Sequence, residues 1–392
     1  MNKISETTLG DLIEFQRGYD LPKSEFKDGI VPVISSNGIL GYHNVAKAKA
    51  PGITIGRSGT VGLPHYIEVD FFPHNTALFV KDFKGNYPRY IYYLIKTLGL
   101  NEYKSGSGVP TMNRNHLHPL KVNAHLDILD QQKIASILST FDAKIQLNNR
   151  INTELEAMSK ILYDYWFVQF DFPNEQGKPY KSSGGKMVWN EMLKREIPEG
   201  WEVKKVKNIA KTGSGSTPIK SKKEYYTNGN IPWINSGEVN NPFIIEAKKY
   251  ITQLGLEKSS TKLFKRGTLL MAMYGATAGK VSILDIEACT NQAICTINVH
   301  HDFHRNYLKL VLEDLYEYLI NLSSGSARDN LSQDRIKELD ILIPEVGIMN
   351  DFDVVISPVY DKVLHLYRES QKLAGLRDWL LPMLLNGQVK VN

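Results

Sequence analysis

The sequence predicts an α+β protein in which two tandem domains of mixed α/β structure are joined by two long antiparallel coiled-coil helices. Three observations predict this fold class. The chain of 392 residues contains an internal repeat, each copy ends in a long heptad pattern, and a loop-like segment lies between the copies. A chain of this length is also expected to hold two domains of ordinary size rather than one.

The repeat is visible as matching segments at a nearly constant separation. The segment "GITIGRSGTVG" at residues 52–62 matches "GTLLMAMYGATAG" at 267–279, and each is expected to be a strand that ends at a glycine-rich turn. Asn75 in "HNTALFV" matches Asn291 in "TNQAICTI", an offset of 291 − 75 = 216. Such regularity indicates a tandem duplication of a unit of about 200 residues.

Each copy ends in a helical pattern with alternating spacings of four and three residues, which is the pattern of a coiled-coil seam. Asp127 or Asp130 is expected to cap the first helix, and Asn386-Gly387 to end the second. Ordinary core helices of two separate domains are the alternative, but the pattern is long for such a helix. The expected seam residues are Ile134, Leu138, Phe141, Ile145, Leu155, Leu162 and Trp166 in the first helix, and Tyr360, Leu364, Tyr367, Leu381 and Leu385 in the second.

Connectivity predicts how these parts are arranged. The first helix joins the two domains, and a helix of about 40 residues spans about 60 Å. If the second helix pairs with it, the second helix runs back antiparallel, which gives a pseudo-twofold dumbbell. The expected boundaries are 1–126 for the first domain, 127–170 for the first helix, 171–200 for a linker, 201–346 for the second domain, and 347–392 for the second helix with a C-terminal tail.

The central stretch "WFVQFDFPNEQGKPYKSSGGKM" at residues 166–187 marks the junction between the copies. Its aromatic beginning is expected to be the last turn of the first helix, where Tyr165, Trp166 and Phe167 pack against the base of the second domain. The Pro-, Gly- and Lys-rich remainder is expected to be a slack connector.

Composition excludes several classes of protein. No apolar run approaches the roughly 18 to 20 residues of a membrane span, so no membrane association is expected. The beginning of the chain lacks the apolar core of a signal peptide. With only two cysteines, Cys289 and Cys295, a reducing compartment is favoured, and a cytoplasmic location is expected. The net charge of +5 is only a weak indication of nucleic acid binding.

The chain also lacks the motifs of catalysis. Gly56, Gly59 and Gly62 do not have the spacing of a dinucleotide fingerprint or a P-loop. No Asn-Pro-Pro-Tyr-type motif for adenine methylation occurs, and Asn291 in its nearest imitation is expected to be a turn or strand-end residue. Acidic-x-Lys triplets occur, but no Pro-Asp dipeptide completes a nuclease-like site. The run of His300, His301 and His304 lacks an acidic or cysteine partner, so a solvated turn is favoured over a metal site.

At this point the chain resembles a known family. The junction "WFVQFDFPNEQGKPYKSSGGKMV" with "EIPEGWEV" is similar to the central junction of the DNA-specificity subunits of type I restriction–modification systems. "LDQQKIASILSTFDAKI" resembles the helix start of their first conserved region, and the duplicated organisation covers essentially the whole chain. The second helix departs from this pattern, because "GIMNDFDVV" lacks the Gln-Gln-Lys-Ile cluster of residues 131–134.

The resemblance implies a non-catalytic subunit with two target-recognition domains. Each domain would read one half of a split, asymmetric site on double-stranded DNA, and the chain would hold two adenine methyltransferase subunits and two restriction/translocase subunits. No cofactor is expected in this chain, since S-adenosylmethionine, ATP and Mg²⁺ would belong to the partner subunits. The alternatives are a specificity subunit of a related or orphan methyltransferase system, a coiled-coil scaffold that does not bind DNA, and a single-chain nuclease or methyltransferase, which the missing motifs disfavour.

The expected DNA contacts are polar and basic loop residues. Arg matches the edge of guanine, Asn and Gln match adenine, and Lys, Ser and Thr mostly contact phosphates. The candidates in the first domain are Arg17, Tyr19, Lys23, Asn37, Arg57, Ser58, Lys104, Asn113 and Arg114. The candidates in the second domain are Ser214, Thr217, Lys220, Lys222, Asn235, Tyr274, Arg328 and Gln333.

Overall fold

The computed structural model describes residues 4–103, 111–323 and 331–391. The chain divides into two compact units: unit 1 consists of residues 1–148 and 369–392, and unit 2 of residues 149–368. Across the described ranges, no helix is both long enough and apolar enough to span a membrane.

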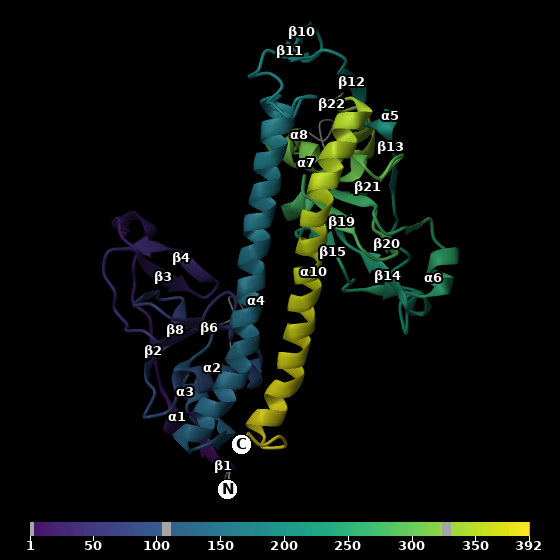
Figure 1. The fold of residues 1–392 in the computed structure, drawn as a ribbon. Helices are drawn as coiled ribbons and strands as arrows, with labels where there is room; N and C mark the ends of the chain where they lie inside the picture. Colours follow the sequence, from purple (N-terminus) through teal and green to yellow (C-terminus); the bar gives the residue numbers. More distant parts are fainter. Residues whose placement is uncertain (1–3, 104–110, 324–330, 392) are drawn as a thin grey trace. The chain divides into compact units, whose positions relative to one another are not determined.

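Unit 1 contains two main sheets and a strand pair (Figure 1). An antiparallel four-stranded sheet has the order β2-β8-β5-β6, with β2 at Glu14–Arg17, β8 at Ala77–Asp82, β5 at Gly52–Gly56 and β6 at Pro64–Ile67. A three-stranded sheet has the order β4-β3-β7, with β4 at Gly38–His43, β3 at Val31–Ser35 and β7 at Phe72–Pro73. The pair is β1 (Ile4–Thr8) with β9 (Lys121–His125). The short helices are α1 (Leu9–Leu12), η1 (Lys23–Glu25), α2 (Pro88–Thr97), η2 (Leu100–Tyr103) and α3 (Arg114–Leu117).

Unit 2 has a similar set of strands. The larger sheet has the order β13-β21-β18-β19-β15, at Ala210–Ser214, Ile294–Val299, Leu269–Ala272, Val281–Leu284 and Phe243–Ile244. The smaller one has the order β16-β14-β20-β17, at Tyr250–Ile251, Ile231–Ile234, Ala288–Thr290 and Leu263–Phe264. β12 (Glu202–Lys205) pairs with β22 (Asp340–Ile343), and β10 (Met187–Asn190) with β11 (Arg195–Pro198). The short helices are α5 (Val206–Ile209), η4 (Lys223–Tyr225), η5 (Ser236–Glu238), α6 (Gln253–Glu257), η6 (Gly275–Thr277), α7 (His304–Asp314), α8 (Tyr316–Ser323) and α9 (Gln333–Lys337).

The strand orders confirm the duplication. The order β2-β8-β5-β6 in unit 1 corresponds to β13-β21-β18-β19 in unit 2, and β4-β3-β7 corresponds to β16-β14-β20. The parallel pair of the smaller sheet is kept as well, between β3 and β7 in one copy and between β14 and β20 in the other. Unit 2 adds β15 and β17 at the sheet edges. Two chain segments with the same connections and the same strand pairing are two copies of one fold.

Two long helices, α4 (Ile128–Tyr163) and α10 (Val346–Leu385), contribute to both units. In unit 1 the beginning of α4 and the end of α10 share one hydrophobic cluster, which includes Leu138 and Leu385. In unit 2 the end of α4 packs in one cluster with the beginning of α10, where Leu364 is buried. Within each unit the two helices therefore run antiparallel, and the predicted fold class is confirmed (Figure 1). The dumbbell arrangement of the whole chain stays a prediction.

The ends of the long helices follow the signals in the sequence. Asp127 is the residue that caps α4, because its Oδ1 accepts a hydrogen bond of 2.7 Å from the backbone N–H of Leu129. α10 ends at Leu385, and Gly387 follows with a φ of +66°, the left-handed conformation that favours glycine.

The residues of the expected seam are buried to different degrees. The buried ones include Tyr360 and Leu364 near the middle of α10, and polar residues lie between the apolar positions of α4. Asn148 and Ser159 are among the buried polar side chains, and the Asn148 amide donates to Glu369 at 2.7 Å. The buried members are Ile134, Leu138, Trp166, Tyr360, Leu364, Leu381 and Leu385, and the half-buried members are Phe141, Ile145, Leu155, Leu162 and Tyr367.

The expectation of a slack connector after α4 is wrong. Phe170 and Phe172 are buried, and Phe172 stacks on Trp201 with 5.1 Å between ring centroids. The carboxylate of Asp171 accepts hydrogen bonds from the backbone and the hydroxyl of Ser182 at 2.7 and 2.6 Å. Burial of the rings and satisfaction of the backbone fix a segment whose Pro, Gly and Lys content suggested a loose loop.

The aromatic run itself forms a π-helical turn, Asp164–Val168, directly after α4. Trp166 and Phe167 are buried in the core of unit 2 as expected, and the Phe167 ring contacts Tyr307 and Phe352, each at 4.7 Å between centroids. Tyr165 is different, because 37% of it is exposed. Tyr165 comes one residue before Trp166 in this turn, so it lies on a different face of the turn and not in the core.

Candidate nucleic-acid interface

In unit 1, the predicted arginines lie where strands of the larger sheet end. Arg17 at the end of β2 is paired with Leu78, and Gly56 at the end of β5 is paired with Ala77. The backbone N–H of Arg57 donates to the carbonyl of Thr76 at 2.8 Å. Arg17 and Arg57 therefore flank the segment that leads into β8.

The turn after β5 is held by its own backbone. Gly62 N–H donates to Gly56 O at 2.9 Å, and a Cβ on Gly56 would lie 1.7 Å from Thr60 O, so only glycine fits there. The half-buried Arg57 donates through Nη1 to the carbonyl of Asn75 at 3.5 Å. The turn thus presents Arg57 from a fixed backbone, with four of its five guanidinium protons not used in this bond.

Other candidates of unit 1 are partly used by the protein itself. The Arg17 guanidinium pairs with Asp20 at 3.3 Å, and the Tyr19 ring packs against Phe72 with 6.0 Å between centroids. Asn113 caps α3, since its Oδ1 accepts from the backbone N–H of Asn115 at 3.0 Å. These roles position the loops, and each uses only part of the hydrogen-bonding capacity of the side chain.

The remaining candidates of unit 1 are more dispersed. Arg114 is exposed on α3 and donates to the carbonyl of Phe15 at 3.4 Å. Lys23 and Asn37 are exposed, on η1 and on the β3–β4 turn, and Ser58 forms an isolated bridge with Thr111. Lys104 lies outside the described residues.

Unit 2 has a cavity of about 580 Å³ at the corresponding end of its sheets. It is lined by three predicted candidates, Thr217, Lys220 and Asn235, from the loop after β13 and the end of β14. The other lining residues were not predicted as DNA contacts from the sequence; they are Tyr226, Trp233, Lys249, Tyr250, Asn291 and Gln292. Among these residues, Asn291 had been noted in the sequence, because it matches Asn75 of the first copy.

Hydrogen bonds fix the wall of this cavity. The backbone N–H of Ser216 donates to Thr290 O at 3.0 Å, and the indole N–H of Trp233 donates to Ser216 O at 3.0 Å. The hydroxyl of Tyr226 donates to Pro218 O at 2.5 Å. A cavity wall held by this many contacts is preorganised for a ligand, which lowers the entropy cost of binding.

Asn291 and Gln292 are each oriented by an internal bond. Asn291 Oδ1 accepts from the backbone N–H of Ala293 at 3.1 Å, and Gln292 Oε1 accepts from the Thr217 hydroxyl at 2.7 Å. Asn291 is therefore the turn residue that the sequence predicted, and it also lines the cavity.

The other candidates of unit 2 lie on separate elements. Ser214 ends β13, and Lys222 lies over the Tyr225 ring at 5.3 Å. Tyr274 is 45% exposed beside the turn after β18, and Gln333 donates to the Thr212 hydroxyl at 3.2 Å. Arg328 lies outside the described residues.

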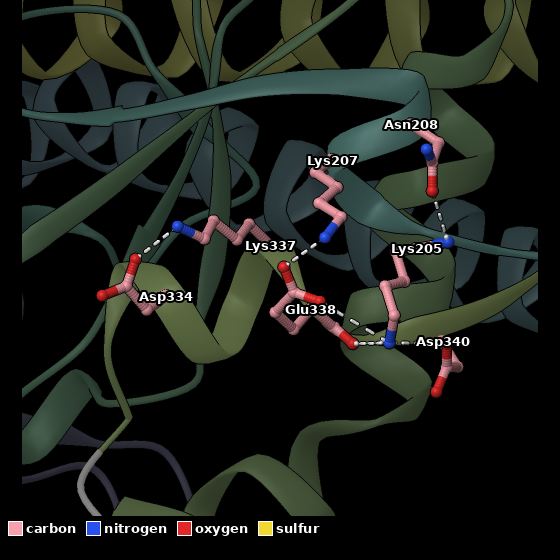
Figure 2. Close-up of polar contacts among 7 residues, drawn as sticks. All are labelled: Lys205, Lys207, Asn208, Asp334, Lys337, Glu338 and Asp340. Carbon is pink, nitrogen blue, oxygen red and sulfur yellow. Dashed lines mark hydrogen bonds and ion pairs between the residues drawn. The ribbon is translucent and has the colours of Figure 1, made fainter.

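A network of exposed ion pairs holds α9, the helix that begins at Gln333 (Figure 2). Lys207 and Lys205 both pair with Glu338, at 2.6 and 3.7 Å, and Lys205 also reaches Asp340 at 3.1 Å. Lys205 is the last residue of β12 and Lys207 lies within α5, so the network ties β12 and α5 to α9 and β22. Proximity of both lysines lowers the pKa of the Glu338 carboxyl, and a hydrogen bond from Lys207 is the largest cause.

The two cysteines of unit 2 are buried. Burial raises the pKa of the Cys289 thiol to about 11 and that of Cys295 to about 12, so both are protonated near neutral pH. In the ranges 4–103, 111–323 and 331–391, no three His, Cys, Asp or Glu side chains group as metal ligands. His304 is buried, and burial with His301 and His300 nearby lowers its pKa to about 4.

The chain matches a known protein family and is similar to several known proteins. The family model described as type I restriction modification DNA specificity domain matches residues 1–157 and 198–357. The chain is 27% identical over 315 residues to the type I restriction enzyme MjaIX specificity subunit of Methanocaldococcus jannaschii, which covers 78% of this chain and 70% of that protein. It is 27% identical over 358 residues to the HindI specificity subunit of Haemophilus influenzae, with 77% of each chain covered. The S subunit of a type I restriction–modification system from M. genitalium has a similar fold, with a TM-score of 0.61 at 14% identity over 100% of this chain and 97% of that one.

Proposed function

Because this chain belongs to the type I restriction modification DNA specificity domain family, we propose that it is the DNA-specificity subunit of a type I restriction–modification system. Its two copies of one fold support this role, since each copy places polar and basic side chains where its sheets end. In this role the chain recognises the DNA sequence and does not itself catalyse methylation or cleavage.

Each copy reads its own half of the DNA target. The two copies share their strand order, but the side chains at equivalent places differ, as Ser58 in the turn after β5 and Tyr274 in the turn after β18 illustrate. Different side chains match different base edges. The target therefore consists of two different short sequences, and the bases between them are unspecified.

The chain also assembles the catalytic subunits. Two adenine methyltransferase subunits and two restriction/translocase subunits bind to it, and these partners hold S-adenosylmethionine, ATP and Mg²⁺. Exposed apolar side chains on the long helices support such a scaffold role, among them Leu129 on α4 and Trp379 on α10, which are 62% and 60% exposed.

The test is to co-express the chain with its adenine methyltransferase and to map methylated adenines across the genome. The expected motif has two specified halves and a gap, without palindromic symmetry. Residues 201–345 are then exchanged for the matching domain of a relative, which is expected to change one half and to keep the other half and the gap. A continuous motif, or a change in both halves, would refute the proposal.

A further inference from the structure

The cavity of unit 2 presents hydrogen-bond donors to whatever it holds. The amide oxygen of Asn291 is taken by the backbone N–H of Ala293, which can only donate, so the outward polar group of Asn291 is its NH₂. The amide oxygen of Gln292 accepts from the Thr217 hydroxyl at 2.7 Å, and its NH₂ remains. Neither NH₂ group has a partner among the residues that the structure describes.

Two lysines add to these donors. Lys220 and Lys249 line the same cavity and are exposed, and no ion pair or hydrogen bond of either ammonium group exists within the described parts of the chain. Asn235 differs from these two amides, because one N–H of its Nδ2 already donates to Glu238 Oε1 at 3.3 Å. The cavity therefore offers two oriented amide donors and two cationic donors.

Base edges in the major groove differ in what they accept. Guanine presents two acceptors, N7 and O6, whereas adenine pairs an acceptor with a donor, and cytosine presents a donor. A bidentate contact to adenine needs the oxygen and the NH₂ of one amide, and in Asn291 and Gln292 one of the two lone pairs of the oxygen is already engaged, which limits how the amide can turn towards a base. Adjacent donors match the two acceptors of guanine best.

We propose that Asn291 and Gln292 read a guanine in the half-site of unit 2, with Lys220 and Lys249 contacting the flanking phosphates. This inference rests on the proposed function and names the base class and the residues that select it. The internal bonds of both amides keep the donors in place before DNA arrives, so little ordering is needed on binding.

The test replaces only the outward group of each amide. Asn291→Asp and Gln292→Glu keep the oxygen that accepts from Ala293 or Thr217, so the turn and the cavity wall persist, but an acceptor replaces the NH₂. Gln176→Glu is the matched control, because it makes the same change at an exposed position of unit 2 outside the cavity. Each variant is co-expressed with the methyltransferase, its complex is isolated to verify assembly, and methylated adenines are mapped.

At one position of the unit 2 half-site, we expect the preference for guanine to fall by about 5- to 150-fold in the cavity variants, the range of one good base contact. The other half, the gap and the control are expected to keep the wild-type motif. A cavity variant that methylates all wild-type sites less, with guanine retained at every position, would overturn the inference and assign the amides to phosphates. The proposed function fails separately, if the wild-type complex shows no two-part motif.

The lysines provide a second contrast. Lys220→Gln and Lys249→Gln are expected to weaken DNA binding evenly across sequences and to reduce the salt slope by about 1 each. A changed base preference in these variants, together with an unchanged preference in Asn291→Asp and Gln292→Glu, would also overturn the assignment of roles.

Discussion

The amide oxygen of Gln131 accepts a hydrogen bond of 2.7 Å from the backbone N–H of Tyr87. The same side chain donates through Nε2 to the carbonyl of His125 and to the amide of Asn86, both at 2.7 Å. Gln131 is fully buried in the first turn of α4, and it joins that helix to β9 and to the start of α2. In the Gln-Gln-Lys-Ile cluster, Gln131 is therefore a buried residue whose hydrogen bonds hold α4 against the rest of unit 1.

Gln131→Leu should destabilise unit 1, because it leaves the N–H of Tyr87 and the carbonyl of His125 without their partner. Unsatisfied buried groups of this kind cost about 1–3 kcal/mol each, so we expect a loss of about 2–4 kcal/mol in the free energy of unfolding. Urea denaturation measures it. Gln132→Leu is the control, since Gln132 is the exposed neighbour on the same turn. Equal stability of the two variants would contradict the role of Gln131.

His304 should make the stability of unit 2 depend on pH. Its folded pKa of about 4 lies below the usual value of 6.5, so the unfolded chain binds a proton more readily than the folded chain. The contribution of neutral His304 to the free energy of unfolding is fully present above about pH 6.5. It is lost as the pH falls towards 4, by up to roughly 3 kcal/mol.

The variant His304→Phe should remove this loss between pH 6.5 and 4 while it keeps the ring contact with Phe303. Unfolding curves over that range measure the difference from the wild type. His365→Phe changes an exposed histidine of α10 and serves as the control. An unchanged pH dependence in His304→Phe would show that other groups cause it.

Leu155→Asp tests the helix packing of unit 2. Leu155 is half-buried and packs against the main cluster of that unit, so a carboxylate there loses apolar contacts and part of its hydration. We expect a loss of about 1–3 kcal/mol in unfolding free energy and weaker assembly with the methyltransferase. Thr153→Asp, two residues earlier and exposed, introduces the same charge without this effect. Wild-type stability of Leu155→Asp would mean that the seam is misassigned.

Arg57→Ala should weaken DNA binding more than it affects folding. The turn that carries Arg57 is held by backbone contacts of Gly56 and Gly62, and these survive the substitution. If the guanidinium reads a base edge, affinity of the assembled complex falls by about 1–3 kcal/mol and the half-site of unit 1 becomes less specific. Arg150→Ala, which removes an exposed arginine of α4, is the control for charge. Unchanged affinity and unchanged site choice would show that Arg57 is a surface residue without a DNA role.

Much of the fold could be predicted because it depends on periodicity and repetition. The four-three spacing identified Leu138 and Leu364, both buried, and the duplication predicted that β5 and β18 would be equivalent strands. The fixed structure of the segment that follows α4 could not be predicted, because it depends on the stacking of Phe172 on Trp201, which is distant in the sequence.

The candidate site was less predictable for a related reason. Its cavity collects Lys220, Trp233, Lys249 and Gln292 from four separate stretches of the sequence, and no local pattern reports such a meeting. The type of a residue also does not show whether its polar atoms are free to contact DNA or are hydrogen-bonded within the protein. The amide oxygen of Asn113, for example, is engaged in capping α3, which no feature of the sequence around it required.

The division of unit 1 into residues 1–148 and 369–392 has a consequence for how the protein is made. Ile134 and Leu138 share their cluster with Leu381 and Leu384, which the ribosome adds only after all of unit 2, residues 149–368. These 368 − 148 = 220 residues take roughly 10–40 s to synthesise, while unit 2 is already a continuous segment that can fold. Until then, Ile134 and Leu138 lack the part of their cluster that α10 provides. We therefore expect a chain that ends before residue 369 to leave this apolar face of α4 uncovered.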